Sequence, residues 1–322
     1  MAEPQDVLER TDLDERLPDL FGAPQRGKVR DVYRVDDQRL LMVATDRISA
    51  FDRVLGCVAH KGQVLTEVSN WWFAQLADIV PNHLLAAVDP NAVLVRACDT
   101  LPVEVVVRGY LTGVTSTSLW PRYRDGAREL YGLVLPDGLA FDDPLPTPII
   151  TPTTKAAANQ HDQPISAADI VSGGLVSAER WSEVEAVALA LFRRGAELSA
   201  AAGLTLVDTK YEFGIDAGGR LTLIDEVHTP DSSRFWRNTD HQHLDKELLR
   251  RWYAERGYRG DGDPPPWPRD LAATLSDAYL ELRQCLLGTQ FQPAASPAGD
   301  RLAANAAAAL QPLRHADGET RP

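Results

Sequence analysis

Alternating apolar and polar residues predict a β-hairpin near the start of the chain. It covers residues 29–45, with a turn at Asp36-Asp37-Gln38. From 63 to 77, apolar residues recur every three or four positions, which predicts an amphipathic helix. Another strand is predicted over 104–111, and the turn-prone segment 99–102 before it is a candidate hinge. The pattern therefore predicts a β-rich first lobe that ends near residue 103.

The second part of the chain mixes an irregular loop, long helices and a tail. Residues 136–164 are rich in proline and lack periodic apolar positions, which predicts an ordered but irregular loop. Three helices are predicted, over 177–202, 243–256 and 269–287. Capping-box spacing makes Ser182 an alternative start for the first of them. The Ala- and Pro-rich residues 291–322 predict a frayed helix or a disordered tail.

A second hairpin, predicted over 204–227, carries one apolar and one ionic face. The ionic residues that alternate with apolar ones are Asp208, Lys210 and Glu212. If Ala217-Gly218 is a two-residue turn, Lys210 lies opposite Asp225, whereas a slip of one residue brings Glu226 there instead. Paired carboxylates are typical ligands of Mg²⁺. The alternative is a charged face that only meets water.

Composition narrows the class of protein. The chain has 322 residues, 44% hydrophobic and 25% charged, which is typical of a globular protein of about two packed units. Its 33 basic and 46 acidic residues give a net charge of −13, which argues against nucleic-acid and membrane partners. The three cysteines form no Cys-x-x-Cys pair, and no targeting segment or bilayer-length apolar run is recognisable. We therefore expect a cytoplasmic protein, as a monomer or a homo-oligomer.

A phosphate-binding site is expected near residue 28, although the common phosphate-binding motifs are absent. Neither Gly-x-x-x-x-Gly-Lys-Ser/Thr nor Gly-x-Gly-x-x-Gly occurs. Gly27 instead precedes Lys28 and Arg30, two cations that we expect on one strand face, where they could clamp a polyphosphate. The competing interpretation is a solvated strand start. Only five of the basic residues are lysines, and this scarcity makes each one a site candidate, because a guanidinium replaces a compact ammonium poorly at a phosphate.

Two arginines mark further candidate anion contacts. Arg108 lies in an otherwise apolar strand, so it needs an anionic partner, either a ligand or an internal carboxylate. Residues 229–236 combine hydroxyls, Arg234 and backbone donors in a turn, which predicts a phosphate pocket. His161 and Asp162 in the irregular loop lack convincing metal-ligand spacing.

Several long motifs follow one another along the chain. They are Gly27-Lys-Val-Arg-Asp-Val-Tyr33, Thr45-Asp-Arg-Ile-Ser-Ala-Phe-Asp52, His60-Lys-Gly62, Val105-Val-Val-Arg-Gly-Tyr-Leu-Thr-Gly113, Thr151-Pro-Thr-Thr-Lys155, His161-Asp162, Val207-Asp-Thr-Lys-Tyr-Glu-Phe-Gly214 and Ile224-Asp-Glu-Val-His-Thr-Pro-Asp-Ser-Ser-Arg-Phe-Trp236. In this order they resemble one family, SAICAR synthetase (phosphoribosylaminoimidazole-succinocarboxamide synthase). The resemblance covers nearly the whole chain, to about Gly288.

The resemblance implies an α+β fold of two lobes with C-terminal helices. Between the lobes it implies a nucleotide cleft of ATP-grasp or kinase-like type, which binds ATP with Mg²⁺. The implied units are a β-rich nucleotide-binding lobe over 1–103, an α/β substrate and metal lobe over 104–290 and a tail over 291–322. The implied reaction joins the carboxylate of carboxyaminoimidazole ribonucleotide (CAIR) to the amine of L-aspartate, giving SAICAR, ADP and phosphate in purine biosynthesis.

The resemblance also implies roles for individual residues. The implied nucleotide contacts are Gly27, Lys28, Val29 and Arg30 at the phosphates and the connection that ends at Glu104 at the adenine. The implied Mg²⁺ ligands are Glu212 and either Asp225 or Glu226. The implied catalytic residues are Lys210, Asp208 and Lys155. The implied substrate-binding residues are Arg108, Ser116, His161, Asp162, Ser233 and Arg234.

One departure from the family pattern leaves alternatives open. The family usually carries a serine where this chain has Val114, and a valine side chain cannot hydrogen-bond to a substrate phosphate. Either a neighbouring hydroxyl replaces it or the ribonucleotide differs. The second interpretation is therefore a related ligase recruited to nucleoside natural-product biosynthesis, and the third is an inactive nucleotide-binding regulator.

Overall fold

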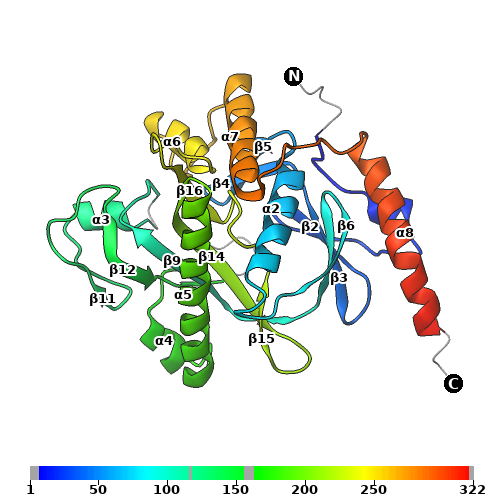
Figure 1. The fold of residues 1–322 in the computed structure, drawn as a ribbon, viewed down its shortest axis with the longest axis horizontal. Helices are drawn as coiled ribbons and strands as arrows, with labels where there is room; N and C mark the ends of the chain where they lie inside the picture. The colour runs from blue at the N-terminus through cyan, green and yellow to red at the C-terminus, as the bar shows by residue number, and fades with distance from the viewer. Residues whose placement is uncertain (1–6, 116–117, 156–162, 319–322) are drawn as a thin grey trace.

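The computed structural model describes residues 7–115, 118–155 and 163–318, with side chains described up to residue 311. Two antiparallel sheets form two lobes that lie side by side in Figure 1. The sheet of the first lobe has the order β1-β2-β3-β7-β6. Its strands are β1 (Gln25–Arg26), β2 (Arg30–Arg34), β3 (Arg39–Ala44), β6 (Leu84–Asp89) and β7 (Ala92–Arg96). The predicted first hairpin is confirmed as the pair β2 and β3.

Two helices cover this sheet. Helix α2 (Lys61–Gln75) confirms the predicted amphipathic helix and packs against β3 and β6. Helix α8 (Ala298–Gly318) returns to the first lobe from the far end of the chain and packs on β6 (Figure 1). On α8 the residues Leu302, Ala306 and Leu310 recur every four positions and are buried with the short helix α1 (Leu13–Arg16).

The described part of the C-terminal segment therefore contains a helix that packs on the first sheet, so of the two predicted alternatives the helix is found there and the disordered tail is not. Alanine favours helix, and the apolar stripe of α8 finds a sheet face to cover, which composition alone does not reveal.

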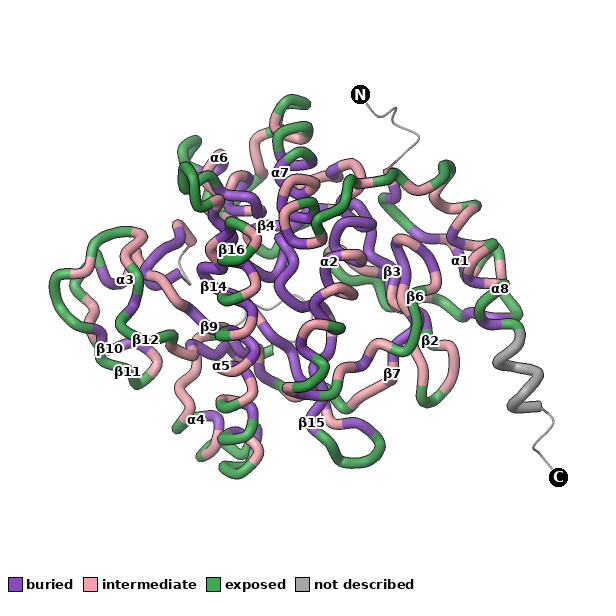
Figure 2. Tube along the Cα trace, in the orientation of Figure 1, coloured by how far each residue is buried: buried purple, intermediate pink, exposed green. Residues whose placement is uncertain are grey.

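The second sheet is built around one long central strand. Its main path is β12-β9-β14-β15, with β13 on β9 and with β8 and β16 on β14. The strands are β8 (Asp99–Thr100), β9 (Val103–Tyr110), β12 (Pro144–Ile150), β13 (Thr153–Thr154), β14 (Leu204–Ile215), β15 (Leu221–Ile224) and β16 (Ser233–Arg237). Figure 2 shows buried segments along β14, the central strand of this sheet.

The second hairpin forms, but its register differs from the two-residue turn. Glu212 pairs with Ile224, so the turn has three residues, Ala217 to Gly219, and the Asp216 N–H donates to the Arg220 carbonyl at 3.0 Å. Gly219 takes a φ of 78°, which suits glycine. The ladder ends at Ile224, so Lys210 is not paired opposite Asp225 in the sheet.

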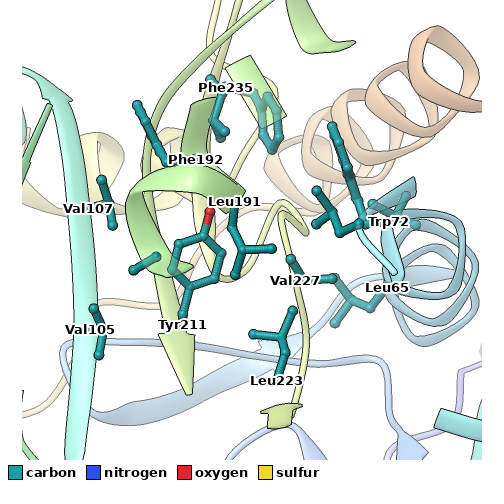
Figure 3. Close-up of a cluster of buried hydrophobic side chains, with 14 of the residues drawn as sticks. Leu65, Trp72, Val105, Val107, Leu191, Phe192, Tyr211, Leu223, Val227 and Phe235 are labelled. Carbon is teal, nitrogen blue, oxygen red and sulfur yellow. The ribbon is translucent and has the colours of Figure 1, made fainter. Parts of the chain in front are cut away.

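Helix α5 (Ala178–Ala201) covers one face of β9 and β14. Its N-cap is Ser177, whose hydroxyl accepts from the Arg180 N–H at 3.3 Å, so the alternative start at Ser182 is wrong. Figure 3 shows the core beneath it, where Tyr211 of β14 and Val107 of β9 lie beside Leu191 of α5. Because side chains alternate along a strand, the ionic residues of β14 point to the opposite face.

The irregular loop predicted over 136–164 is partly a strand. β12 lies at the edge of the sheet, where prolines cost no ladder hydrogen bonds, and it pairs with β9 across a register shift. The preceding segment carries α3 (Leu119–Arg124), β10 (Glu129–Leu130) and β11 (Leu133–Val134) around a small core of its own. Helix α4 (Ala167–Ser172) follows β13 and precedes α5.

A further hairpin and two helices complete the fold. β4 (Arg47–Ala50) and β5 (Arg53–Cys57) form a separate hairpin that the sequence did not reveal. Helices α6 (Glu247–Glu255) and α7 (Arg269–Leu287) confirm the two predicted C-terminal helices, and α7 packs against both α2 and α6. Among the described helices, none has the length and apolarity that a bilayer span requires.

Candidate active site

The ionic face of β14 forms the floor of the candidate site. Asp208 and Glu212 are buried there and the Lys210 side chain is 27% exposed, so this face does not simply meet water. The neighbouring strand β9 supplies Glu104 and Arg108 to the same face, since Lys210 pairs with Val106 and Asp208 with Arg108. Two central strands therefore present five ionic side chains to one surface.

Lys210 is the centre of a carboxylate cluster. Its Nζ donates to Glu104 Oε1 at 3.0 Å, hydrogen-bonds to Glu212 and lies 4.0 Å from Asp225 Oδ2. Burial works to lower the pKa of Lys210, but Glu212, Glu104 and Asp225 together raise it well above its usual value. The ammonium is therefore fully charged at neutral pH and faces acids from β14, from β9 and from the residue after β15.

Glu212 is held between two ammonium groups. Its carboxylate oxygens accept from Lys155 and Lys210 respectively. Burial works to raise the pKa of Glu212, but the two lysines outweigh it and lower the pKa well below its usual value. Lys155, which directly follows β13, therefore reaches the same cluster as the residues of β14.

Asp225 and Glu226 converge on one guanidinium. Arg30 of β2 lies 2.8 Å from Asp225 Oδ1 and 2.7 Å from Glu226 Oε2. Asp225 has a φ of 65°, and this left-handed residue lets two consecutive carboxylates face the same cation instead of opposite sides. Burial, with the nearby Glu212 charge, raises the pKa of Asp225 to about 6, although Arg30 and Lys210 oppose the rise.

These contacts distinguish the two acids that the sequence left as alternatives. Asp225 faces both Arg30 and Lys210, whereas the Glu226 carboxylate contacts Arg30 and accepts from the Thr229 hydroxyl. The acids Glu212 and Asp225 therefore share Lys210 as a neighbour, as the central prediction from the sequence requires.

The donor set is compatible with a hard cation that brings other ligands. Among the described residues, no group of three or more His, Cys, Asp and Glu side chains is arranged to hold a metal ion on its own. Glu212 and Asp225 supply carboxylate oxygens, and Mg²⁺ commonly takes one or two carboxylates and completes its shell with water and phosphate oxygens. The pair thus fits Mg²⁺ accompanied by a nucleotide better than an all-protein metal site.

Lys28, before β2, and Arg30, its first residue, differ in exposure. Lys28 Nζ lies 2.5 Å from Asp52 Oδ1 and its side chain is 51% exposed, whereas the Arg30 side chain is 14% exposed and faces the acid pair. The Gly27 N–H donates to the Arg30 carbonyl at 2.7 Å, and the Val29 carbonyl accepts from Thr45. The two cations therefore contact different carboxylates, Asp52 and the acid pair.

Two buried arginines share one carboxylate at the other end of β14. Arg108 donates to Asp208 Oδ2 at 3.3 Å and to the Thr151 hydroxyl at 2.8 Å. Arg234 of β16 donates to the same Asp208 oxygen at 2.5 Å and to Glu247 at 3.1 Å. The anionic partner predicted for Arg108 is thus the internal carboxylate of Asp208.

A serine hydroxyl also contacts this arginine pair, since Ser118 Oγ accepts from Arg234 at 3.3 Å. The Ser233 hydroxyl instead donates to Thr209 at 2.8 Å, and because Ser233 pairs with Thr209 it lies on the opposite face of the sheet from Asp208. Val114 contributes its backbone N–H, which donates to Glu247 at 3.2 Å. Ser116, His161 and Asp162, three of the predicted substrate-binding residues, lie outside the described residues.

The sequence reasoning missed a buried ion pair next to these clusters. Lys61 of α2 is fully buried, and its Nζ lies 2.8 Å from Asp231, which also accepts from the Tyr279 hydroxyl at 2.8 Å. Burial lowers the pKa of Lys246, near Asp231, to about 8. The scarcity of lysine was the one signal for both lysines, but it does not indicate their partners.

Comparison with known proteins decides the family. A family model described as SAICAR synthetase matches residues 24–265. The chain belongs to the SAICAR synthetase family. A phosphoribosylaminoimidazole-succinocarboxamide synthase of Legionella pneumophila (strain Lens) is 46% identical over 299 residues, which cover 88% of this chain and 95% of that protein. A putative phosphoribosylaminoimidazole-succinocarboxamide synthase 2 of Agrobacterium fabrum is 44% identical over 291 residues, which cover 87% and 92%.

Solved structures extend the likeness to the fold. A SAICAR synthase from Saccharomyces cerevisiae, complexed with SAICAR, matches with a TM-score of 0.76 at 32% identity and covers 88% of this chain and 99% of that one. A SAICAR synthetase in complex with ADP matches with a TM-score of 0.67 at 25% identity and covers 84% and 99%. The α+β fold expected from the family resemblance is therefore confirmed.

Proposed function

We propose that this chain is an ATP-dependent ligase that joins CAIR to L-aspartate and releases SAICAR, ADP and phosphate. The observation that carries the proposal is the carboxylate cluster around Lys210, which lies within the region that matches the family. The yeast structure with SAICAR and the family structure with ADP support the product and the nucleotide.

The reaction needs ATP because a carboxylate is a poor acyl donor. Direct attack by an amine would have to expel an oxide ion, so the carboxylate of CAIR first attacks the γ-phosphorus and ADP leaves. The amine of L-aspartate then attacks the acyl phosphate, phosphate leaves, and the amide nitrogen loses a proton. The protein must stabilise charge on the transferred phosphoryl group and exclude water from the activated acyl group.

Lys210 and Lys155 suit the transfer step. Both ammonium groups contact Glu212, so they lie where a phosphoryl group and a carboxylate would approach the acid cluster. Mg²⁺ held by Glu212 and Asp225 would neutralise charge on the nucleotide phosphates. Glu226 would remain paired with Arg30, which also contacts Asp225. With Glu212 and Asp225 engaged by the cation, Lys210 would be available to contact the anionic reactants.

The nucleotide would lie against β2 and the start of β9. We assign Gly27, Lys28, Val29 and Arg30 to its phosphate side. The adenine would meet backbone groups of the connection between Cys98 and Val103. Glu104, predicted at that connection, instead directs its side chain toward Lys210 and Thr153. We therefore assign the Glu104 carboxylate to positioning of Lys210.

The ribonucleotide would lie at the arginine pair. Arg108 and Arg234 offer guanidinium donors to a phosphate, with Asp208 between them. The Ser233 hydroxyl donates to Thr209, so we do not assign it to this phosphate. The serine that the family usually has at the position of Val114 has a candidate substitute in Ser118, whose hydroxyl reaches Arg234. This contact favours an unchanged ribonucleotide, with Lys155 and the segment that contains His161 and Asp162 left for L-aspartate.

The test is ADP release by the purified protein with ATP and Mg²⁺. We expect ADP only when CAIR and L-aspartate are both present, with SAICAR formed in equal amount. No ADP with CAIR, but ADP with a different ribonucleotide, would establish the altered-substrate ligase instead. No ADP with any ribonucleotide, together with ATP binding, would establish the inactive regulator.

A further inference from the structure

A buried carboxylate at the start of α6 contacts one member of the arginine pair. Glu247 is the first residue of α6 and is 1% exposed. Its Oε2 atom accepts from Arg234 Nε at 3.1 Å and from Arg250 at 3.0 Å, and its Oε1 atom accepts from the Val114 N–H at 3.2 Å. Burial works to raise the pKa of Glu247, but the two arginines outweigh it and lower the pKa to about 2. Glu247 is therefore ionised at neutral pH and accepts from three described N–H groups.

The start of α6 is tied to the strand that carries Arg234. The Asp245 carboxylate accepts from the Glu247 N–H at 2.6 Å and from the Phe235 N–H at 2.8 Å. Asp245 is fully buried, and Phe235 directly follows Arg234 on β16. The backbone, and not only the ion pair itself, therefore places Glu247 beside Arg234.

Three partners fix the plane of the Arg234 guanidinium. Its Nε donates to Glu247, one terminal nitrogen donates to Asp208 at 2.5 Å and the other donates to Ser118 at 3.3 Å. A guanidinium carries five N–H groups in one rigid plane, so these described contacts use three of them and leave two for another acceptor. Gly113 lies close beside this plane, since a Cβ atom there would be 2.8 Å from Arg234.

Glu247 is the partner that holds the inner nitrogen of this guanidinium. Two N–H groups of an arginine match two oxygens of a phosphate only when the plane of the guanidinium is correctly oriented. Asp208 and Ser118 contact the terminal nitrogens, and Asp208 is shared with Arg108. Loss of the Glu247 acceptor would leave Arg234 Nε buried without that partner, which favours another orientation of the side chain.

We propose that Glu247 is a positioning residue for the ribonucleotide phosphate, because its carboxylate fixes the orientation in which Arg234 offers its two remaining N–H groups. This inference rests on the proposed function, since it takes the ribonucleotide to be the occupant of the arginine pair. It assigns a role to the first residue of α6, which the sequence analysis did not identify.

The first test is Glu247→Met, which keeps the length of the side chain and removes both acceptor oxygens. Steady-state kinetics with each substrate varied should give a KM for CAIR raised about tenfold or more, with the KM for ATP unchanged. Glu247→Gln keeps one acceptor oxygen and should raise the KM for CAIR less, by about threefold. If Glu247→Met does not fold, the Gln variant decides alone.

The direction of the change distinguishes positioning from charge balance. If Glu247 only offset the charge of the arginines, its removal would strengthen the binding of an anion. An unchanged or lowered KM for CAIR in the folded variants would therefore overturn the inference.

Glu67→Met is the matched control for loss of a carboxylate from a buried arginine. Glu67 of α2 accepts from Arg283 Nε at 2.7 Å, and Arg283 is 8% exposed. This variant should lower the melting temperature and leave the KM for CAIR unchanged. A KM for CAIR raised as much in Glu67→Met as in Glu247→Met would overturn the inference, because loss of stability alone would then account for both.

A binding measurement separates this inference from the proposed function. Ribose 5-phosphate serves as a phosphate monoester probe, with ribose as the control that lacks the phosphate, and the stabilisation of each protein is measured by thermal shift. We expect ribose 5-phosphate to stabilise the wild type and to stabilise Glu247→Gln less, even if CAIR proves not to be the substrate. Equal or greater stabilisation of the variant would overturn the inference, as would no stabilisation of the wild type, while the ADP assay decides the ligase proposal.

Discussion

Replacing Lys210 with alanine tests the proposed reaction centre. The ammonium contacts Glu104 and Glu212 and lies 4.0 Å from Asp225, so the variant removes one positive charge from among three acids. Glu212 keeps Lys155 and Asp225 keeps Arg30, and Glu104 keeps the Thr153 hydroxyl at 3.3 Å. Because each acid retains a partner, we expect the free energy of unfolding to fall by only about 1–2 kcal/mol.

The effect on turnover should be much larger. An interaction that forms mainly in the transition state lowers kcat and kcat/KM together when it is removed. We expect Lys210→Ala to lower kcat more than about 100-fold, which corresponds to roughly 2.7 kcal/mol. The assay is ADP release at saturating CAIR, L-aspartate and ATP, with urea unfolding of the same preparation.

Arg220→Ala is the control for loss of a cation from the same hairpin. Arg220 pairs with Asp216 at 2.8 Å beside the turn, and its side chain is 63% exposed. This variant should turn over like the wild type. Wild-type turnover in Lys210→Ala would refute the assignment, and a loss of turnover matched by a loss of folded protein would make Lys210 a structural residue.

Further predictions concern the metal, the turn of the hairpin β4–β5 and the C-terminal helix. Burial raises the pKa of Asp225 to about 6, and the protonated carboxyl is no longer a metal ligand. The affinity for Mg²⁺, measured by calorimetry in the presence of ADP, should therefore fall about tenfold per pH unit below pH 6. The Phe51 ring packs edge-on against Tyr258 at 5.5 Å, and Phe51→Ala should cost about 2 kcal/mol in urea unfolding. Leu302 of α8 is 1% exposed, and Leu302→Ala should cost about 2–4 kcal/mol, whereas a disordered tail would show no change.

The alternation of residues along β14 predicted the two-faced strand correctly. Apolar and ionic positions with a period of two identify the faces of a strand, so Asp208, Lys210 and Glu212 could be placed together from the sequence. The pairing partner could not be placed, because register depends on the turn. A three-residue turn and the left-handed Asp225 bring the acids together by a route that the chain pattern does not reveal.

The features of the site and fold that could not be predicted from the sequence depend on contacts between segments far apart in the chain. Arg108 was predicted to need an anion, and burial of one charge in an apolar strand justified that prediction. Its partner Asp208 is 100 residues away. Likewise the apolar stripe of α8 is buried only because α8 packs on the first sheet, a contact between distant segments that the sequence does not show.

A crystal structure with ADP and Mn²⁺ tests the central claim most directly. Mn²⁺ replaces Mg²⁺ at oxygen sites, and its anomalous scattering locates it independently of the nucleotide. We predict one anomalous peak coordinated by Glu212 and Asp225 and by phosphate oxygens of ADP, with Lys210 turned toward the nucleotide. A peak remote from both carboxylates, or ADP bound away from β2 and β14, would contradict the account.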